Sequence, residues 1–303
     1  MDVYLPIANL SVNGVVIVLL GAATGILSGI FGVGGGFLTT PLLIFYGVPP
    51  TVAAASAASQ VTGASVSGVF AHRQRGGVDM QIGAVMVAGG VIGAGIGAVL
   101  FRLLESLGQI DTVINILYVL LLGTIGALMG RESIQALRQK KTDRPRAAKR
   151  RHHPLVASLP LRWRFYKSGL YISPLAPLLL GMVVGVLTML MGVGGGFILV
   201  PAMLYILGMS ANVVVGTSLF QILFVTMAVS LMHAVTTKAV DVVLAALLLM
   251  GSVTGAQIGT RIALQAKPEL LRLLLALIVL AVALRMAFGL GVRPDEVYTV
   301  VPL

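Results

Sequence analysis

A glycine-rich hexapeptide occurs twice in this chain, and each copy interrupts an otherwise apolar, helix-like stretch. The copies are Gly32-Val33-Gly34-Gly35-Gly36-Phe37 and Gly192-Val193-Gly194-Gly195-Gly196-Phe197, and Pro41 and Pro201 follow them at the same spacing. Glycine readily adopts positive φ, so such a run lets a helix end and the chain reverse. A break in an apolar environment also frees backbone N–H and C=O groups, which are costly in lipid unless they find partners. The fold must therefore bury or use two sets of free backbone groups.

Composition places the chain in a membrane. Of its 303 residues 57% are hydrophobic and 10% are charged, whereas soluble domains carry roughly 25% charged residues. Apolar runs near the roughly 20-residue length that spans a bilayer recur throughout. We predict an all-α polytopic membrane protein. The N-terminus has Asp2 and no basic region, which argues against a cleavable signal peptide, and the lack of cysteine excludes disulfides and thiolate metal sites.

The chain is also an internal duplication. Residues from Gly21 to Pro41 match those from Gly181 to Pro201, and the register continues with few slips through Gln60 and Gln221. Such self-similarity indicates two homologous units. The predicted organisation is a first transmembrane unit over residues 1–130, a basic linker over 131–173 and a second transmembrane unit over 174–303.

The linker sets the predicted orientation. It holds more than half of the chain's 21 basic residues, whereas residues 1–72 contain no Lys or Arg. Basic loops beside membrane helices normally face the cytoplasm, so we predict a cytoplasmic linker and an outside N-terminus. The linker is also a candidate contact for anionic lipid. No nucleic-acid role is expected, because membrane orientation already explains the charge.

Because the N-terminus is predicted outside and the linker in the cytoplasm, the first unit must cross the membrane an odd number of times. The clear crossings of the first unit are Thr51 to Phe70, Met80 to Leu100 and Thr112 to Met129, which leaves Val12 to Tyr46 as a re-entrant hairpin that turns at the glycines. In the second unit the same elements are the hairpin Leu175 to Leu207 and the crossings Ala211 to Leu231, Val242 to Ile262 and Leu270 to Phe288. We therefore predict inverted-topology repeats. The alternative is eight full crossings in two parallel repeats.

Two broken helices that enter from opposite faces predict an anion site. The half-helix after each break would point its first amides, and the positive end of its dipole, at the membrane centre. Basic residues sit at span ends, so neutral polar groups must complete the site. The candidate binding residues are both hexapeptides together with Gln60, Gln221, Ser56, Thr217, Ser28 and Thr188.

Simpler interpretations exist for several of these features. The hexapeptide can be a packing turn, and Ser or Thr in membrane helices usually bonds back to its own helix. Asp79 and Asp241 begin crossings and are predicted helix N-caps, with proton relay as the alternative. The ridges Gly89-Gly93-Gly97 and Gly251-Gly255-Gly259 are predicted helix-packing surfaces, and His72 and His233 are predicted to be interfacial.

The doubled GVGGGF-x-x-x-P element resembles the TauE/SafE sulfite exporter family, also called the toluene-sulfonate uptake permease (TSUP) family, over nearly the whole chain. The resemblance implies transport of a sulfur-containing anion such as sulfite or an organosulfonate across a prokaryotic inner membrane. It also implies that residues 32–37 and 192–197 carry the site, and it leaves substrate and direction open.

We therefore expect a secondary carrier or facilitator with no cofactor, rather than an enzyme. The sequence has no phosphate-binding loop of the form G-x-x-x-x-G-K-[ST], so the chain is not expected to hydrolyse nucleotides. A cation carrier that uses half-helix carbonyls and an intramembrane enzyme are the alternatives.

Overall fold

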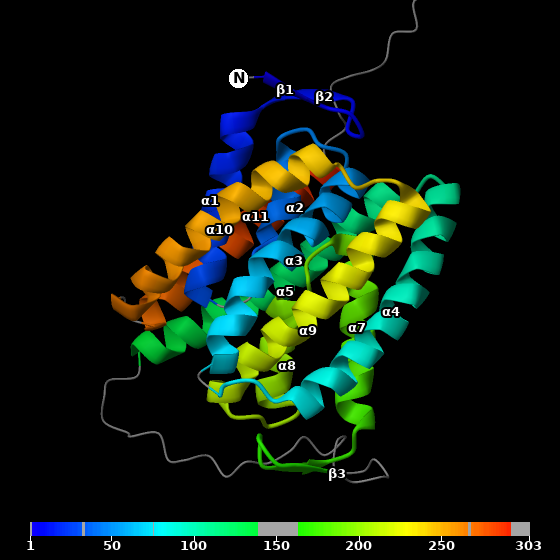
Figure 1. The fold of residues 1–303 in the computed structure, drawn as a ribbon. Helices are drawn as coiled ribbons and strands as arrows, with labels where there is room; N and C mark the ends of the chain where they lie inside the picture. The colour runs from blue at the N-terminus through cyan, green and yellow to red at the C-terminus, as the bar shows by residue number, and fades with distance from the viewer. Residues whose placement is uncertain (1, 32–33, 75, 139–162, 266–267, 292–303) are drawn as a thin grey trace, which may run out of the picture.

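The fold is a bundle of helices with a small β-hairpin at each of two ends, seen in a computed structural model that describes residues 2–31, 34–74, 76–138, 163–265 and 268–291 (Figure 1). The first half contains β1 (Asp2–Leu5), β2 (Leu10–Asn13), α1 (Gly14–Phe31), α2 (Gly36–Phe45), α3 (Pro50–Gln74), α4 (Met80–Ser106) and α5 (Ile110–Arg138). The second half contains β3 (Trp163–Phe165), β4 (Leu170–Ile172), α7 (Leu175–Met191), α8 (Gly196–Tyr205), α9 (Ala211–Met232), the π-helix η1 (His233–Thr237), α10 (Val242–Gln265) and α11 (Pro268–Gly291).

A helix covers every predicted crossing, and the same element order appears in both halves. The sequence did not predict the antiparallel hairpins β1–β2 and β3–β4, which lie at opposite ends of the bundle (Figure 1). The range 131–173, predicted as linker, holds the end of α5 and all of β3–β4. The remaining linker positions, 139–162, lie outside the described residues.

Two tightly packed helix pairs join the halves. A Cβ placed on Gly21 or Gly25 of α1 would collide with the backbone of α10 at Leu248 or Ser252, and Gly251 meets α1 in the same way. The equivalent pair is α4 with α7, where Gly89 meets Leu178 and Gly93 meets Met182. These contacts confirm the predicted packing ridges. In both pairs the residue numbers rise together, so the paired helices run parallel.

Equivalent helices of the two halves run antiparallel where they meet. In the α3–α9 pair, Thr62 bonds Thr226 whereas the later Gly68 meets the earlier Leu219. In the α5–α11 pair, Gly126 meets Leu280 and Gly130 is closest to Ala276. Both pairs of equivalent helices are therefore antiparallel at their contacts.

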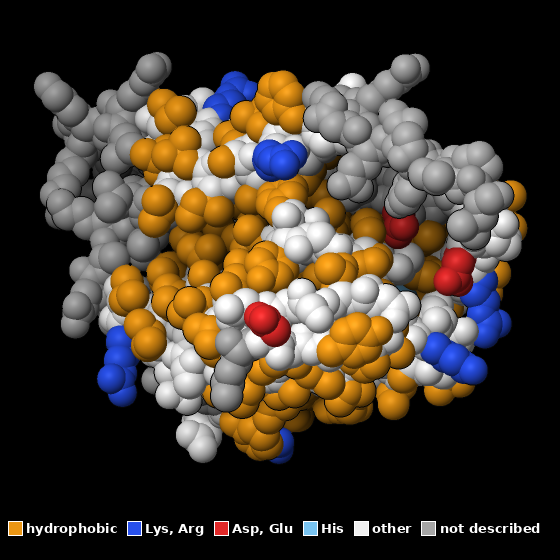
Figure 2. Space-filling view, turned by 90° about the horizontal axis from the view of Figure 1, so that it is seen from above, with side chains coloured by type: hydrophobic (Ala, Val, Ile, Leu, Met, Phe, Trp, Pro, Cys, Tyr) orange, Lys and Arg blue, Asp and Glu red, His pale blue; other side chains and the backbone are white. Residues whose placement is uncertain are grey.

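The outer surface matches a bilayer environment. Among the described residues six helices are long and apolar enough to cross a membrane, α1 among them. Large hydrophobic side chains such as Val99, Leu120 and Phe288 are exposed. Figure 2 looks down on the end of the bundle that carries β1–β2 and shows many hydrophobic side chains there, together with several charged ones. The central helix α3 is not one of the six, and its residues 52–58 are all buried. A helix shielded by protein does not need a lipid-like composition.

Each of two buried aspartates links one β-hairpin to the opposite half of the chain. Oδ1 of Asp79 accepts hydrogen bonds from the amides of Gln81 (3.0 Å) and Ile82 (3.2 Å), and its Oδ2 accepts one from Ser168 of the second hairpin at 3.0 Å. Asp241 caps α10 in the same way and accepts a bond from the Ile7 amide of the first hairpin at 3.0 Å. The predicted N-caps are confirmed, and each carboxylate also links the two halves.

We expect Asp241→Ala to lower the free energy of unfolding by about 2–4 kcal/mol, because it removes a helix cap and leaves the Ile7 amide without its partner. Thermal unfolding in detergent measures the loss. Asp2→Ala is the matched control, since Asp2 is exposed in β1. Equal melting temperatures for the two variants would contradict the structural role given to Asp241.

Candidate functional site

The two glycine breaks use different backbone geometry. In the second break Gly192, Gly194 and Gly195 all have positive φ, of 70°, 72° and 77°. In the described part of the first break only Gly34 does, at 75°. Gly35 is right-handed at φ −65°, and Gly36 begins α2. The equivalent residues Gly35 and Gly195 therefore differ in backbone conformation, although the two hexapeptides are identical in sequence.

At each break the chain doubles back along the helix it has just left. A Cβ on Gly35 would lie 3.1 Å from the carbonyl oxygen of Thr24 in α1, and one on Gly195 would lie 3.4 Å from Oγ1 of Thr188 in α7. Intrahelical bonding then begins at Leu38 and Ile198, whose amides bond Gly35 and Gly195 at 3.2 and 3.0 Å. The amides just before them, of Gly36, Phe37, Gly196 and Phe197, belong to the first turn of each half-helix and have no bond to another residue of the described ranges.

The two breaks meet at the centre of the bundle. The rings of Phe37 and Phe197 stack with centroids 4.7 Å apart and planes 3° from parallel. A Cβ on Gly36 would lie 2.8 Å from the carbonyl oxygen of Gly192 and 2.9 Å from that of Val193. Only glycine permits this approach. The structure thus brings together hexapeptide residues that are far apart in the sequence; Gly32 and Val33 lie outside the described residues.

The antiparallel helices α3 and α9 line this centre. Val61 contacts the positions of Gly34, Gly36 and Gly194, and Ile222 contacts Gly34 and Gly194 from the other side. One residue further along α3, the Thr62 hydroxyl donates to the Thr226 hydroxyl at 2.8 Å. This bond between the halves was not predicted, because nothing in either local sequence identifies its distant partner.

The glutamines that precede Val61 and Ile222 are buried without hydrogen bonds. Gln60 is 1% exposed and Gln221 is 0% exposed, and neither the amide nitrogen nor the oxygen of either side chain has a partner among the described residues. Nε2 of Gln60 is 3.6 Å from a Cβ placed on Gly35. Nε2 of Gln221 is 3.1 Å from one placed on Gly90 of α4. Each unsatisfied buried polar group costs about 1–3 kcal/mol, so the pair is poised for a polar partner.

The predicted hydroxyl candidates have partners of their own. The hydroxyls of Ser56 and Thr217 accept bonds from the amides of Asp241 (3.1 Å) and Asp79 (2.9 Å), at the starts of α10 and α4. Thr188 bonds back to Val184 at 2.8 Å but lies beside Gly195. Ser28 is partly buried on α1. Of this group, Thr188 is the hydroxyl that the described contacts place at a break.

Three donors cover carbonyls at the end of α7, a role that the sequence predicted for none of them. The Tyr118 hydroxyl of α5 donates to the Met191 carbonyl at 2.7 Å, and the Thr40 hydroxyl of α2 reaches the same oxygen at 3.3 Å. Nε2 of His233 lies 2.9 Å from the Met189 carbonyl. His233 is fully buried at the point where α9 ends, and its location at the membrane interface stays a prediction.

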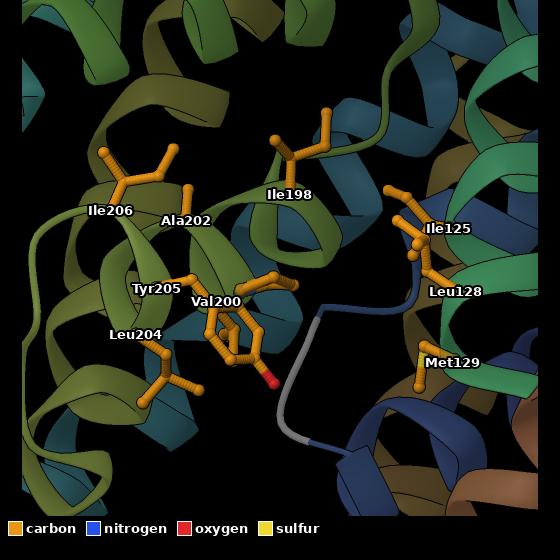
Figure 3. Close-up of a pocket in the computed structure, with 10 residues that line it drawn as sticks. Ile125, Leu128, Met129, Ile198, Val200, Ala202, Leu204, Tyr205 and Ile206 are labelled. Atoms are coloured by element: carbon orange, nitrogen blue, oxygen red, sulfur yellow. The ribbon is translucent and has the colours of Figure 1, made fainter. Parts of the chain in front are cut away.

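A separate apolar cleft of about 450 Å³ lies between α5 and α8 (Figure 3). Its lining includes Ile125, Leu128 and Met129 of α5 and Ile198, Val200 and Tyr205 of α8. No charged side chain of the described residues lines it. The cleft therefore offers no counter-charge to an ion, and the polar groups lie deeper, at the breaks.

Comparison with known proteins gives the family. A model of the family described as "Sulfite exporter TauE/SafE" matches residues 17–286. A "Probable membrane transporter protein YjnA" of Bacillus subtilis is 27% identical over 89% of this chain and 98% of its own length. A "Probable membrane transporter protein" of Xylella fastidiosa is 30% identical over 87% of this chain and 91% of its own. No solved structure matches.

Proposed function

The chain belongs to the sulfite exporter TauE/SafE family of membrane transporters, and we propose that it carries a small sulfur-containing anion, such as sulfite or an organosulfonate, bound where the two breaks meet. The observation that carries the proposal is the buried glutamine pair beside the breaks. Two primary amides without partners among the described residues, that of Gln60 beside Gly35 at the start of α2 and that of Gln221 beside Gly90 of α4, supply the hydrogen-bond donors that an oxyanion requires.

The charge distribution supports binding by dipoles rather than by a counter-ion. No Lys or Arg is among the buried residues of the described part of the chain. An anion at the breaks would meet the amides of Gly36, Phe37, Gly196 and Phe197, the positive ends of two half-helices and the Gln Nε2 groups. Such a site neutralises a guest only partly, which suits a carrier that must also release it.

An inverted repeat with re-entrant hairpins is the topology we propose. It is supported by the antiparallel α3–α9 and α5–α11 pairs, by the doubling back at each break, and by the hairpins at opposite ends of the bundle. The basic residues of 131–173 then place that segment in the cytoplasm and the N-terminus outside, in the inner membrane of a prokaryote.

In this proposal the moving parts are not the two sequence units. They are two mixed bodies, each of which combines helices from both units. The interlocked backbones of α1 with α10, and of α4 with α7, cannot slide without collisions at their glycines. One body therefore contains α1, α2, α3 and α10, and the other contains α4, α7, α8 and α9. The α3–α9 contact and the Phe37–Phe197 stack lie between them, and their separation opens the closed centre to one side at a time.

Gln60→Leu and Gln221→Leu test the proposal. We expect either change to weaken sulfite binding about tenfold, because each removes the donors of one amide, while the melting temperature stays the same or rises as an unsatisfied polar group disappears. The measurements are ligand-dependent thermal stabilisation with sulfite, sulfate, thiosulfate, taurine and sulfoacetate, and sulfite flux in liposomes.

Gln109→Leu is the matched control, since Gln109 is exposed between α4 and α5. The proposal fails if the two buried variants bind and carry all five anions as the unaltered protein does. It also fails if the unaltered protein shows no vectorial anion flux.

A further inference from the structure

A helix break offers an ion two opposite electrostatic ends. The half-helix that follows the break presents amides and a positive dipole end, whereas the helix that precedes it presents free carbonyls and a negative end. An anion gains from the first and is repelled by the second. A cation has the opposite preference, and half-helix carbonyls are known ligands for coupling cations in transporters. Selectivity between anions and cations at the break therefore depends on whether the carbonyls of the preceding helix are hydrogen-bonded or free.

At the second break, donors cover three of the carbonyls at this end, those of Thr188, Met189 and Met191. The Thr188 carbonyl accepts from the Gly192 amide at 2.8 Å, and the Met189 carbonyl is 2.9 Å from Nε2 of His233. The Met191 carbonyl, the last of α7, accepts from the Tyr118 hydroxyl at 2.7 Å and from the Thr40 hydroxyl at 3.3 Å.

Met191 is the decisive position. A carbonyl oxygen has two lone pairs, and two hydroxyl donors take both of them, so none is left for a cation. The two hydroxyls come from α5 and α2 of the first half and reach the end of a helix of the second half. Tyr118 and Thr40 are both fully buried, so water does not compete for these bonds at the surface.

We propose that Tyr118, supported by Thr40, is a specificity-determining residue: by occupying the Met191 carbonyl it removes one cation ligand from the second break and so favours anions over cations there. This inference rests on the proposed function. It gives a role to the carbonyl side of the break, which the anion does not touch. It also gives a physical reason why the Met191 carbonyl does not bind a cation.

Tyr118→Phe tests the inference, because it removes only the hydroxyl and keeps the ring in the apolar core. In liposomes that contain the full chain we expect sulfite affinity to fall about five- to tenfold as the free carbonyl repels the anion. We also expect no sodium flux in the unaltered protein and a measurable sodium flux in Tyr118→Phe. A merely structural hydroxyl would change the melting temperature without changing the ratio of sulfite to sodium flux.

Thr124→Val is the matched control. Thr124 lies on the same helix and bonds back to Leu120 at 2.7 Å on the exposed face, so its loss should alter neither flux. Thr40→Val is the second test variant and should change the flux ratio in the same direction by a smaller factor. If Tyr118→Phe does not fold, the Thr40→Val result decides.

Unchanged sulfite affinity and unchanged sodium flux in the test variants overturn the inference. The proposed function stands separately: it survives if Gln221→Leu weakens sulfite binding while Tyr118→Phe does not, and it falls if sulfite binds equally well to every variant.

Discussion

Gly195→Ala is expected to abolish anion flux while the protein still inserts into the membrane. The residue has φ 77°, where an L-residue costs roughly 1–2 kcal/mol. Its new Cβ would also collide with Val184 of α7 and would approach Oγ1 of Thr188 to 3.4 Å. The break would have to move away from α7, which displaces the first amides of α8. Insertion should persist, because the apolar lengths of the helices are unchanged.

Flux into liposomes, normalised to the amount of inserted protein, measures this effect. The sequence treats Gly35 and Gly195 as equivalent, but the structure does not. Gly35→Ala is expected to be mild, since φ is −65° and the nearest atom, the Thr24 carbonyl oxygen, is 3.1 Å away. Gly123→Ala on α5 is the neutral control, with no atom within 4 Å. Normal flux in Gly195→Ala would show that the geometry of the second break does not govern transport.

A disulfide between α3 and α9 is expected to stop transport. The Thr62 and Thr226 hydroxyls are 2.8 Å apart, so cysteines at both positions can approach disulfide distance. The chain contains no other cysteine, which makes Thr62→Cys with Thr226→Cys a clean pair. In the proposed mechanism the two mixed bodies separate along this contact, and a covalent bond holds the centre closed.

The measurement is sulfite flux before oxidation, after oxidation and after reduction. We expect nearly complete loss on oxidation and recovery with a reductant, whereas each single cysteine variant keeps its flux throughout. Undiminished transport by a fully cross-linked protein would mean that α3 and α9 do not part, and the division into mixed bodies would be wrong.

Features that depend on local pattern could be predicted from the sequence. Apolar runs of bilayer length gave the helices, because a backbone in lipid must bond within its own segment. Glycines at every fourth position gave the packing ridges of α4 and α10, since they allow backbones to touch. Asp79 and Asp241, each directly before an apolar run, gave the N-caps.

Features that depend on contacts between residues far apart along the chain could not be predicted from the sequence. The second acceptor bonds of the two aspartates reach Ser168 and Ile7 in hairpins that carry no strong strand pattern. Ser56 and Thr217 resembled site residues but bond the amides that start α10 and α4. Tyr118 is a single tyrosine within an apolar run, and only the fold brings it to Met191.

By itself the sequence determined that this chain is a duplicated membrane protein with two helix breaks, because duplication, apolar length and glycine runs are properties of neighbouring residues. The tertiary structure decided what those breaks face. It stacked Phe37 on Phe197, left Gln60 and Gln221 without partners and covered the Met191 carbonyl. These outcomes depend on which helices pack together, and packing joins residues whose separation along the chain leaves no trace in local pattern.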